Sequence, residues 1–323
     1  MTGKPFNFGV LGASNFAAGT MAPAIHAAQG VRLAALASQN AAGIARFAAF
    51  CPDLRVHDSY EALLADPEID AVYIPLPNHL HVEWALKANA AGKHVLCEKP
   101  IALKTAEIDR LIAARDASGL QLAEAYMIVH HPQWHRAKAL LAEGAIGDLR
   151  HVDGVFSFPL AEGQNIRNRP ETGGGALRDV GVYPIGATRF ATGAEPVSIR
   201  AAQMEFVNGI DTYTNFSADF GSFTLNTMVS IRMAARQEMV FHGTKGVMRL
   251  NAAFTANVVG LPEVALELAD NRLVVERFAN INQYVLQVQA FCFAARNGTP
   301  YAWPLEQARG TQAMLEMVFA AGA

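Results

Sequence analysis

The sequence predicts an α/β protein in which a doubly wound parallel sheet precedes an α+β domain with a large, mostly antiparallel open sheet. From residue 7 to about residue 124, short apolar runs alternate with helical patterns, which is typical of right-handed βαβ crossovers. Beyond residue 149, alternating segments are separated by turn signals such as Asn208-Gly209, which is typical of antiparallel strands. We therefore expect one domain at residues 1–124 and a second at residues 125–323.

Each element of the first domain is predicted from its apolar pattern and from the residues that end it. Strands are expected at residues 8–11, 31–37, 71–74, 94–97 and 120–125. Helices are expected up to residue 28 after a Gly/Ser turn, and then at 41–50, 79–91 and 104–118. Asn40 is expected to cap the second helix, and Gly119 to close the last one.

The second domain begins with a helix at about residues 132–143, after which the sequence pattern changes to mostly successive strands. Strands are expected at 149–158, 197–207, 213–220, 222–231, 237–241 and 247–250, because polar and apolar residues alternate there. Helices are expected at 180–191, 283–296 and 305–319.

Composition excludes several classes of protein. The chain has 323 residues, enough for about two domains, with 51% hydrophobic and 17% charged residues. A net charge of −3 predicts neither a nucleic-acid surface nor binding to an anionic membrane. No apolar run reaches the length of a membrane span. Three cysteines favour a reducing compartment, and no secretory leader is recognised, so we expect a cytoplasmic protein.

The strand at 94–97 ends in Glu98-Lys99-Pro100, an unusual end for a buried strand. A lysine there costs desolvation, so its charge needs a partner or a task. Pro100 disfavours helical geometry at Lys99 and keeps that residue extended. In open parallel sheets the ligand crevice lies beyond the carboxyl ends of the strands, where Lys99 would lie. The alternative is a surface pair of Glu98 and Lys99 in a turn.

Residues 12–17, Gly-Ala-Ser-Asn-Phe-Ala, lie between the first strand and the first helix, where a dinucleotide fingerprint belongs. Gly12 permits the tight turn, and Ala17 is small enough for close helix–sheet packing. Ser14 replaces the glycine that lets the backbone approach the pyrophosphate, but it offers a hydroxyl. A bound dinucleotide is expected to contact Gly12, Ser14, Asn15 and Phe16.

The second strand ends in Ser38-Gln39-Asn40, without the Asp or Glu that grips the ribose 2′-OH of NAD. Since Ser38 and Gln39 can donate hydrogen bonds and no carboxylate repels a 2′-phosphate, we expect NADP to be preferred, with NAD as the alternative. Ser38 and Asn40 could instead only cap the next helix. Arg46 could supply a cation, but it lies far along that helix.

Four motifs together resemble the glucose–fructose oxidoreductase / inositol dehydrogenase / MocA (Gfo/Idh/MocA) family. They are residues 9–17, residues 73–81, residues 92–100 with Glu-Lys-Pro, and residues 173–184 with Gly-Gly-Gly, Asp179 and Tyr183. Their order and spacing match across nearly the whole chain. Many members carry His where Tyr183 stands. The tyrosine resembles the branch with glucose–fructose oxidoreductase, dimeric dihydrodiol dehydrogenase and NADP-linked xylose dehydrogenase.

The resemblance implies that Lys99 lies beside the nicotinamide and the substrate hydroxyl, and that Asp179 and Tyr183 complete the catalytic site. Asp179 and Tyr183 are four residues apart, so they share one helix face. The glycines before them are expected to leave room for a substrate. In our hypothesis Tyr183 takes the hydroxyl proton, Lys99 lowers the Tyr183 pKa and polarises the oxygen, and Asp179 orients the substrate. Alternatively Lys99 is itself the base.

The resemblance also implies residues along the cofactor groove. Asn78 and His81 are expected at its nicotinamide end, and Leu76, Glu98 and Lys99 are expected to contact the cofactor. Arg167 either holds a cofactor phosphate or a substrate hydroxyl, or lies in a solvated loop. His79 and His81 have no third ligand nearby, so no metal site is expected.

Together these features predict an NAD(P)-dependent oxidoreductase acting on a hydroxyl or carbonyl group of a sugar or polyol, with the aldose C1 favoured. The alternatives are a trans-dihydrodiol dehydrogenase and a dinucleotide-binding sensor without turnover. The resemblance further implies a homodimer or homotetramer formed through the C-terminal sheet. Neither a nucleic acid nor a membrane is expected as a partner.

Overall fold

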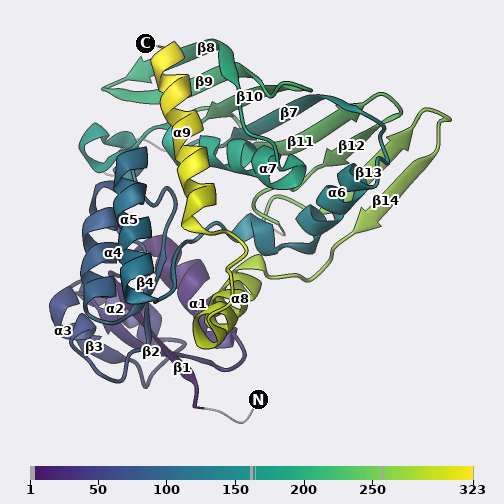
Figure 1. Cartoon of the computed structure of the whole chain (residues 1–323). Coiled ribbons are helices and arrows are strands. Elements are labelled where there is room, and N and C mark those ends of the chain that lie inside the picture. The colour runs from purple at the N-terminus through teal and green to yellow at the C-terminus, as the bar shows by residue number, and fades with distance from the viewer. Residues whose placement is uncertain (1–3, 161–162, 164, 257, 323) are drawn as a thin grey trace. The chain divides into compact units, whose positions relative to one another are not determined.

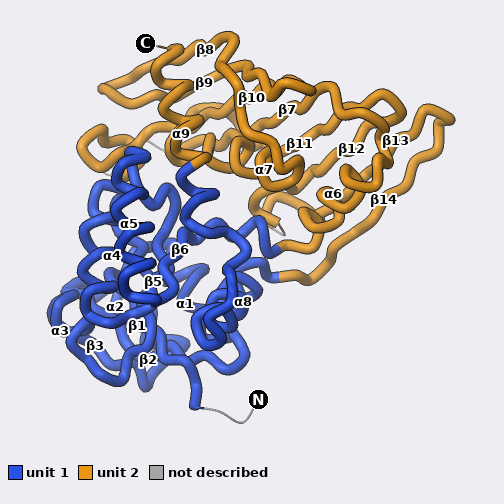
Figure 2. The backbone as a smooth tube through the Cα atoms, viewed as in Figure 1, with its two compact units in different colours: residues 1–130, 282–309 blue, residues 131–281, 310–323 orange. Residues whose placement is uncertain are grey.

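The computed structural model describes residues 4–160, 163, 165–256 and 258–322 (Figure 1). It divides into two compact units, which are coloured separately in Figure 2. Unit 1 contains residues 1–130 and 282–309, and unit 2 contains residues 131–281 and 310–323. The domain boundary after residue 124 stays a prediction.

Unit 1 is built on a six-stranded parallel sheet, which confirms the predicted class. Its strand order is β3-β2-β1-β4-β5-β6, and each neighbouring pair runs parallel. This order is that of doubly wound dinucleotide-binding sheets, in which the strand order reverses between β1 and β4. The strands are β1 (Phe6–Leu11), β2 (Val31–Ala37), β3 (Arg55–His57), β4 (Ala71–Ile74), β5 (His94–Cys97) and β6 (Leu122–Glu124).

Helices connect these strands, and two expected helix ends are confirmed. The Asn40 side chain accepts a hydrogen bond from Gly43 N and caps α2, while Gly119, with a φ of 69°, ends α5. The helical segments of unit 1 are η1 (Ala17–Met21), α1 (Ala22–Ala27), α2 (Ala41–Ala48), α3 (Tyr60–Leu64), η2 (Asn78–Leu80), α4 (His81–Ala90), α5 (Thr105–Ser118), η3 (Met127–His130) and α8 (Gln283–Asn297), with α9 (Leu305–Ala321) continuing into unit 2.

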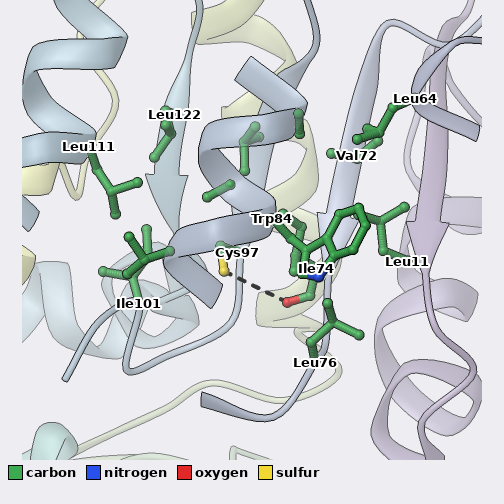
Figure 3. Packing of buried hydrophobic residues seen from close by; sticks show 14 of the residues in the cluster. Leu11, Leu64, Val72, Ile74, Leu76, Trp84, Cys97, Ile101, Leu111 and Leu122 are labelled. Atoms are coloured by element: carbon green, nitrogen blue, oxygen red, sulfur yellow. Dashed lines mark hydrogen bonds between the residues drawn. The ribbon is translucent and has the colours of Figure 1, made fainter. Parts of the chain in front are cut away.

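The core of unit 1 lies between the sheet and its helices (Figure 3). Ile74 and Cys97, at the ends of β4 and β5, are fully buried, and the Cys97 thiol lies 3.9 Å from the Ile74 carbonyl oxygen. Leu111 of α5 and Leu122 of β6 are equally buried. Strands β1, β4, β5 and β6 are buried along almost their whole length, as expected for parallel strands covered by crossover helices on both faces, whereas the edge strand β3 is mostly exposed.

Unit 2 contains an eight-stranded sheet with the order β14-β13-β12-β11-β7-β10-β9-β8. Among the described strands of this sheet only β7 and β10 pair in parallel, and the other pairs are antiparallel, as predicted for a mostly antiparallel sheet. Asn208 and Gly209, both with positive φ, form the expected tight turn. The strands are β7 (Leu149–Ser157), β8 (Ser198–Val207), β9 (Ile210–Asp219), β10 (Thr224–Ser230), β11 (Arg236–Gly243), β12 (Gly246–Leu250), β13 (Glu263–Leu268) and β14 (Leu273–Arg277).

Helices of unit 2 pack through aromatic side chains. The fully buried Trp134 stacks on Phe254 at a ring distance of 6.4 Å and donates from Nε1 to Ala253 O at 2.7 Å. Phe156 also stacks on Phe254, with 5.2 Å between the ring centroids. The helical segments are α6 (Pro132–Ala142), η4 (Ile166–Asn168), η5 (Pro170–Thr172), η6 (Leu177–Gly181) and α7 (Val182–Thr192).

Several short elements were not predicted. Strand β3 has three residues and helix α3 has five, too few for a hydrophobic period to be recognised. Strand β14 at the sheet edge is mostly exposed, so it lacks the alternation that marks a half-buried strand. The segments η1 and η6 are π-helical turns where ordinary helix was expected.

Residues 282–309 belong to unit 1 through buried contacts of Trp303. Its indole Nε1 donates to Glu124 Oε2 at 2.9 Å, and its ring stacks on Tyr126 at 4.4 Å. The other oxygen, Glu124 Oε1, accepts from Ile101 N at 2.9 Å. Because Glu124 is only 5% exposed, both donors depend on this carboxylate rather than on water.

We expect Glu124→Gln to destabilise the protein by about 2 kcal/mol, because an amide can accept from one donor but presents NH₂ to the other. Urea unfolding monitored by circular dichroism measures this change. Glu83→Gln is the matched control, since the Glu83–Lys87 pair is exposed and contributes about 0.5 kcal/mol or less. Equal unfolding midpoints for the two variants would contradict the assignment.

Candidate active site

The turn after β1 has the geometry expected of a phosphate-binding turn. Gly12 has a φ of 95°, a conformation that favours glycine, and its N–H donates to Ala37 O at 2.9 Å. Ala17 is fully buried at the start of the π-helical turn η1, as predicted from its size. Ser14 Oγ accepts from Ala17 N at 3.1 Å, so its hydroxyl proton can still be donated. Phe16 packs its ring against Tyr284.

The polar residues at the end of β2 organise the start of α2. Ser38 Oγ accepts from Asn40 N at 3.1 Å, and Asn40 Oδ1 caps Gly43 N. Gln39 donates from Nε2 to Asp58 O at 3.1 Å. No side chain of this segment is acidic, so the carboxylate that selects the ribose 2′-OH of NAD is absent from residues 38–40.

Arg46 of α2 reaches the turn after β1, a contact that was not predicted from the sequence. Its Nη1 donates to Asn15 Oδ1 at 2.5 Å and its Nη2 to Ala13 O at 3.3 Å. Arg46 does lie far along α2, as expected, but its side chain still reaches this turn because α2 packs closely on it. Gly43 and Arg46 are three residues apart, and this spacing was the signal that could have revealed it.

His81 ties together the segments that follow β4 and β5. It is fully buried, with Nε2 2.7 Å from Leu76 O and Nδ1 2.8 Å from Pro100 O. Burial lowers the His81 pKa to about 4, and the nearby positive charge of Lys99 lowers it further. The two carbonyl oxygens favour the protonated ring and act in the other direction. In the described part of the chain the His81 ring thus contacts backbone carbonyl oxygens. Asn78 begins the short helical turn η2 just before His81.

Glu98 and Lys99 lie where the sequence predicted, directly after strand β5. Both side chains are half-buried. Glu98 Oε1 accepts from the Tyr73 hydroxyl at 2.6 Å, and Oε2 accepts from Lys99 N at 3.3 Å. Burial raises the pKa of Glu98, while the Tyr73 bond and the Lys99 charge oppose this shift. The peptide between Lys99 and Pro100 is cis. Lys99 thus sits between two anchored neighbours.

In unit 2 the structure brings Asp179 and Arg167 together. Arg167 Nε donates to Asp179 Oδ2 at 2.7 Å, and Asp179 is only 8% exposed. Asp179 lies in the π-helical turn η6, and Tyr183 follows in α7. The Tyr183 ring packs on Phe156 at 5.3 Å and is 6% exposed. Such π-helical turns occur often at functional sites.

The glycines before this turn have a structural reason that differs from the expected one. A Cβ at Gly174 would lie 2.5 Å from Arg167 O, and one at Gly175 would overlap the Asp211 carboxylate. The expectation that the glycine run leaves room for a substrate is therefore wrong for these two positions. The buried Asp211 was missed by sequence reasoning. Its Oδ2 accepts from Leu177 N at 2.7 Å and anchors the start of η6.

No metal site competes with this interpretation in the described chain. Among residues 4–160, 163, 165–256 and 258–322, no group of three or more His, Cys, Asp and Glu side chains could hold a metal ion. The same residues contain no helix of sufficient length and hydropathy to cross a membrane.

We expect the stability of the protein to depend on pH through His81. Since the folded pKa is lowered to about 4, the unfolded chain binds this proton first as the pH falls. The free energy of unfolding should lose about 2 kcal/mol through His81 between about pH 7.5 and pH 5.

Urea unfolding at both pH values measures this loss. In His81→Gln the pH-dependent loss should shrink by that amount, whatever the variant costs in stability at neutral pH. The exposed His79, changed to Gln, is the matched control and should follow the parent protein. The same pH dependence in His81→Gln and His79→Gln would refute the assignment.

The chain is similar to known oxidoreductases over most of its length. Residues 6–126 match the model described as an oxidoreductase family with an NAD-binding Rossmann fold, and residues 134–249 match the GFO/IDH/MocA C-terminal domain. A Rhizobium meliloti protein described as an uncharacterized oxidoreductase is 39% identical, covering 96% of this chain and 95% of its own. A D-xylose 1-dehydrogenase (NADP(+)) from Haloferax volcanii is 35% identical, covering 90% and 89%.

A solved structure extends the similarity to the whole fold. The 3-ketoreductase from Actinomadura kijaniata, in complex with NADP and TDP-benzene, superposes with a TM-score of 0.91 at 30% identity and covers 98% of each chain. The sequence motifs, the two sheets and these matches all indicate the same family. The chain belongs to the Gfo/Idh/MocA family and is an NAD(P)-dependent oxidoreductase with sugar-related relatives.

Proposed function

We propose that the chain transfers a hydride between NADP and a hydroxyl or carbonyl group of a sugar or polyol, with the C1 hydroxyl of an aldose favoured. The proposal rests on the presence of Lys99 in unit 1 and of Asp179 and Tyr183 in unit 2 at the motif positions of the family. The Lys99 backbone N–H is bonded to Glu98, Asp179 is paired with Arg167, and the Tyr183 ring packs on Phe156. Two relatives add support. One is named a D-xylose 1-dehydrogenase that uses NADP(+), and the other is a ketoreductase solved with NADP.

The residues present in unit 1 fit a nicotinamide dinucleotide. The turn at Gly12 exposes backbone close to a helix start, and Ser14 retains a hydroxyl proton to donate. We propose Gly12, Ser14, Asn15 and Phe16 for the pyrophosphate end. Residues Ser38 and Gln39 would face the adenosine ribose, and Leu76, Asn78, His81 and Glu98 would shape the nicotinamide end.

When bound, the nicotinamide ring supplies or accepts the hydride. The chain's own residues handle the proton. We propose that the Tyr183 phenol exchanges it with the substrate oxygen, while the Lys99 ammonium hydrogen-bonds and polarises that oxygen. Asp179, already bonded to Arg167, would orient the substrate. In the alternative, Lys99 is the base and Tyr183 the positioning residue.

Partners and compartment are part of the same proposal. We infer a homodimer or homotetramer assembled through the sheet of unit 2, and a cytoplasmic location consistent with three free cysteines, each buried. Sizing by light scattering tests the assembly, since a monomer would contradict it.

Absorbance of the reduced nicotinamide tests the proposed function, recorded with NADP and then NAD against aldoses, inositols and dihydrodiols, and with NADPH and then NADH against keto sugars. Reduction of NADP with an aldose is the expected result. Turnover of a dihydrodiol alone would favour the dihydrodiol dehydrogenase. Tight cofactor binding without turnover on any substrate would favour a sensor.

We expect Lys99→Met and Tyr183→Phe each to lower kcat by about 100-fold or more, because each removes a group that meets the reacting oxygen. Affinity for NADPH, measured by fluorescence titration, should stay within about twofold, since neither side chain is proposed to bind the dinucleotide phosphates. The pH profile of kcat separates the two proton-acceptor hypotheses, because only loss of the base removes its ionisation from the profile.

Lys87→Met and Tyr213→Phe are matched controls. Lys87 forms an exposed pair with Glu83, and Tyr213 lies on β9 of the sheet. Both variants should keep the parent kcat. Full activity in Lys99→Met or Tyr183→Phe would refute the role proposed for that residue.

A further inference from the structure

Arg46 is an exposed arginine whose guanidinium lies against the phosphate-binding turn. It comes from α2, the helix that follows β2, and it bonds to Asn15 and Ala13 of the turn after β1. The side chain therefore connects the helix that follows the second strand to the first turn, one of the places where a doubly wound sheet binds the adenosine half of a dinucleotide.

Close packing of α2 on the turn brings Arg46 there. Gly43 is buried, and a Cβ at this position would lie 2.5 Å from Ala13 Cβ and 3.2 Å from Ala13 O. Only the absence of a side chain lets the helix approach this closely. Arg46 is one turn further on the same helix face, so its side chain meets the turn as well.

The partners of Arg46 leave its positive charge available. Asn15 Oδ1 and Ala13 O are neutral acceptors, and neither bond neutralises the guanidinium. A guanidinium has more N–H donors than these two bonds use. The strand end beside α2 carries Ser38, Gln39 and Asn40 in place of a carboxylate. A fixed cation near a strand end whose residues 38–40 carry no carboxylate suits a phosphate on the ribose.

We infer that Arg46 binds the ribose 2′-phosphate of NADP and sets the preference for NADP over NAD. This inference rests on the proposed function. The bond to Asn15 fixes the plane of the guanidinium, so less side-chain freedom is lost when the phosphate binds. Ser38 assists, because its Oγ accepts from Asn40 N and its hydroxyl proton remains for the phosphate.

Binding titrations that need no substrate test the inference. Dissociation constants of NADPH, NADH, 2′,5′-ADP and 5′-AMP are measured for the parent chain and for Arg46→Gln. NADPH and 2′,5′-ADP should bind about 10-fold to 100-fold more weakly to the variant, as expected for loss of charged hydrogen bonds. NADH and 5′-AMP should change by about twofold or less. Arg46→Lys should bind NADPH more tightly than Arg46→Gln but more weakly than the parent, since lysine has the positive charge but lacks the planar set of N–H donors of a guanidinium.

Arg32→Gln is the matched control, because Arg32 is an exposed arginine at the opposite end of β2. It should keep the parent affinities. An equal loss of NADPH and NADH in Arg46→Gln would overturn the inference and indicate contact with the shared adenosine. Unchanged NADPH affinity would overturn it as well. A parent chain that binds neither NADPH nor NADH would instead refute the proposed function, and a parent that prefers NADH would refute its choice of NADP.

Discussion

The buried imidazole of His81 fixes the edge of the sheet on which the candidate cofactor site depends. Its ring lies between two backbone carbonyl oxygens, of Leu76 after β4 and of Pro100 after β5, and the neutral ring donates to one of them. These strands are neighbours, and their carboxyl ends form the edge where ligands bind in doubly wound sheets. The buried ring packs between both segments and is bonded to one of them, so it restricts where each segment leaves the sheet, and Lys99 lies next to one of them.

Other buried polar groups complete the same edge. Tyr73 on β4 donates to Glu98 after β5, and Glu124 at the end of β6 holds Ile101 N. Each bond joins one strand end to the next. Because an unsatisfied buried polar group costs about 1–3 kcal/mol, these bonds are hard to rearrange independently. The backbone around Lys99 is therefore fixed by its neighbours.

Sequence reasoning succeeded where a residue's environment is local. The strands Val31–Ala37, Ala71–Ile74 and His94–Cys97 were predicted with their observed bounds, because each is a short, mostly apolar run with clear ends. The Asn40 cap was found for the same reason. Lys99 stood out because a lysine that ends a buried strand breaks the local pattern.

Prediction from the sequence failed where the role of a residue depends on a contact with a residue far away in the sequence. Gly175 is glycine because the Asp211 carboxylate occupies the place of its Cβ, and the two residues are far apart in sequence. Arg46 reaches Asn15 only because Gly43 lets α2 pack on the turn. The π-helical turns η1 and η6 carry no periodic pattern, so neither could be distinguished from ordinary helix.

The two arginines near candidate sites differ in what they bond to, and this difference separates their roles. Arg167 pairs with the buried carboxylate of Asp179, so much of its charge is already balanced. A bound phosphate would have to compete with that carboxylate, and we therefore favour orientation of Asp179 over phosphate binding for Arg167. Arg46 bonds to neutral oxygens and keeps its charge for a ligand. The same functional group thus serves as a fixed counter-ion in unit 2 and as an anion receptor in unit 1.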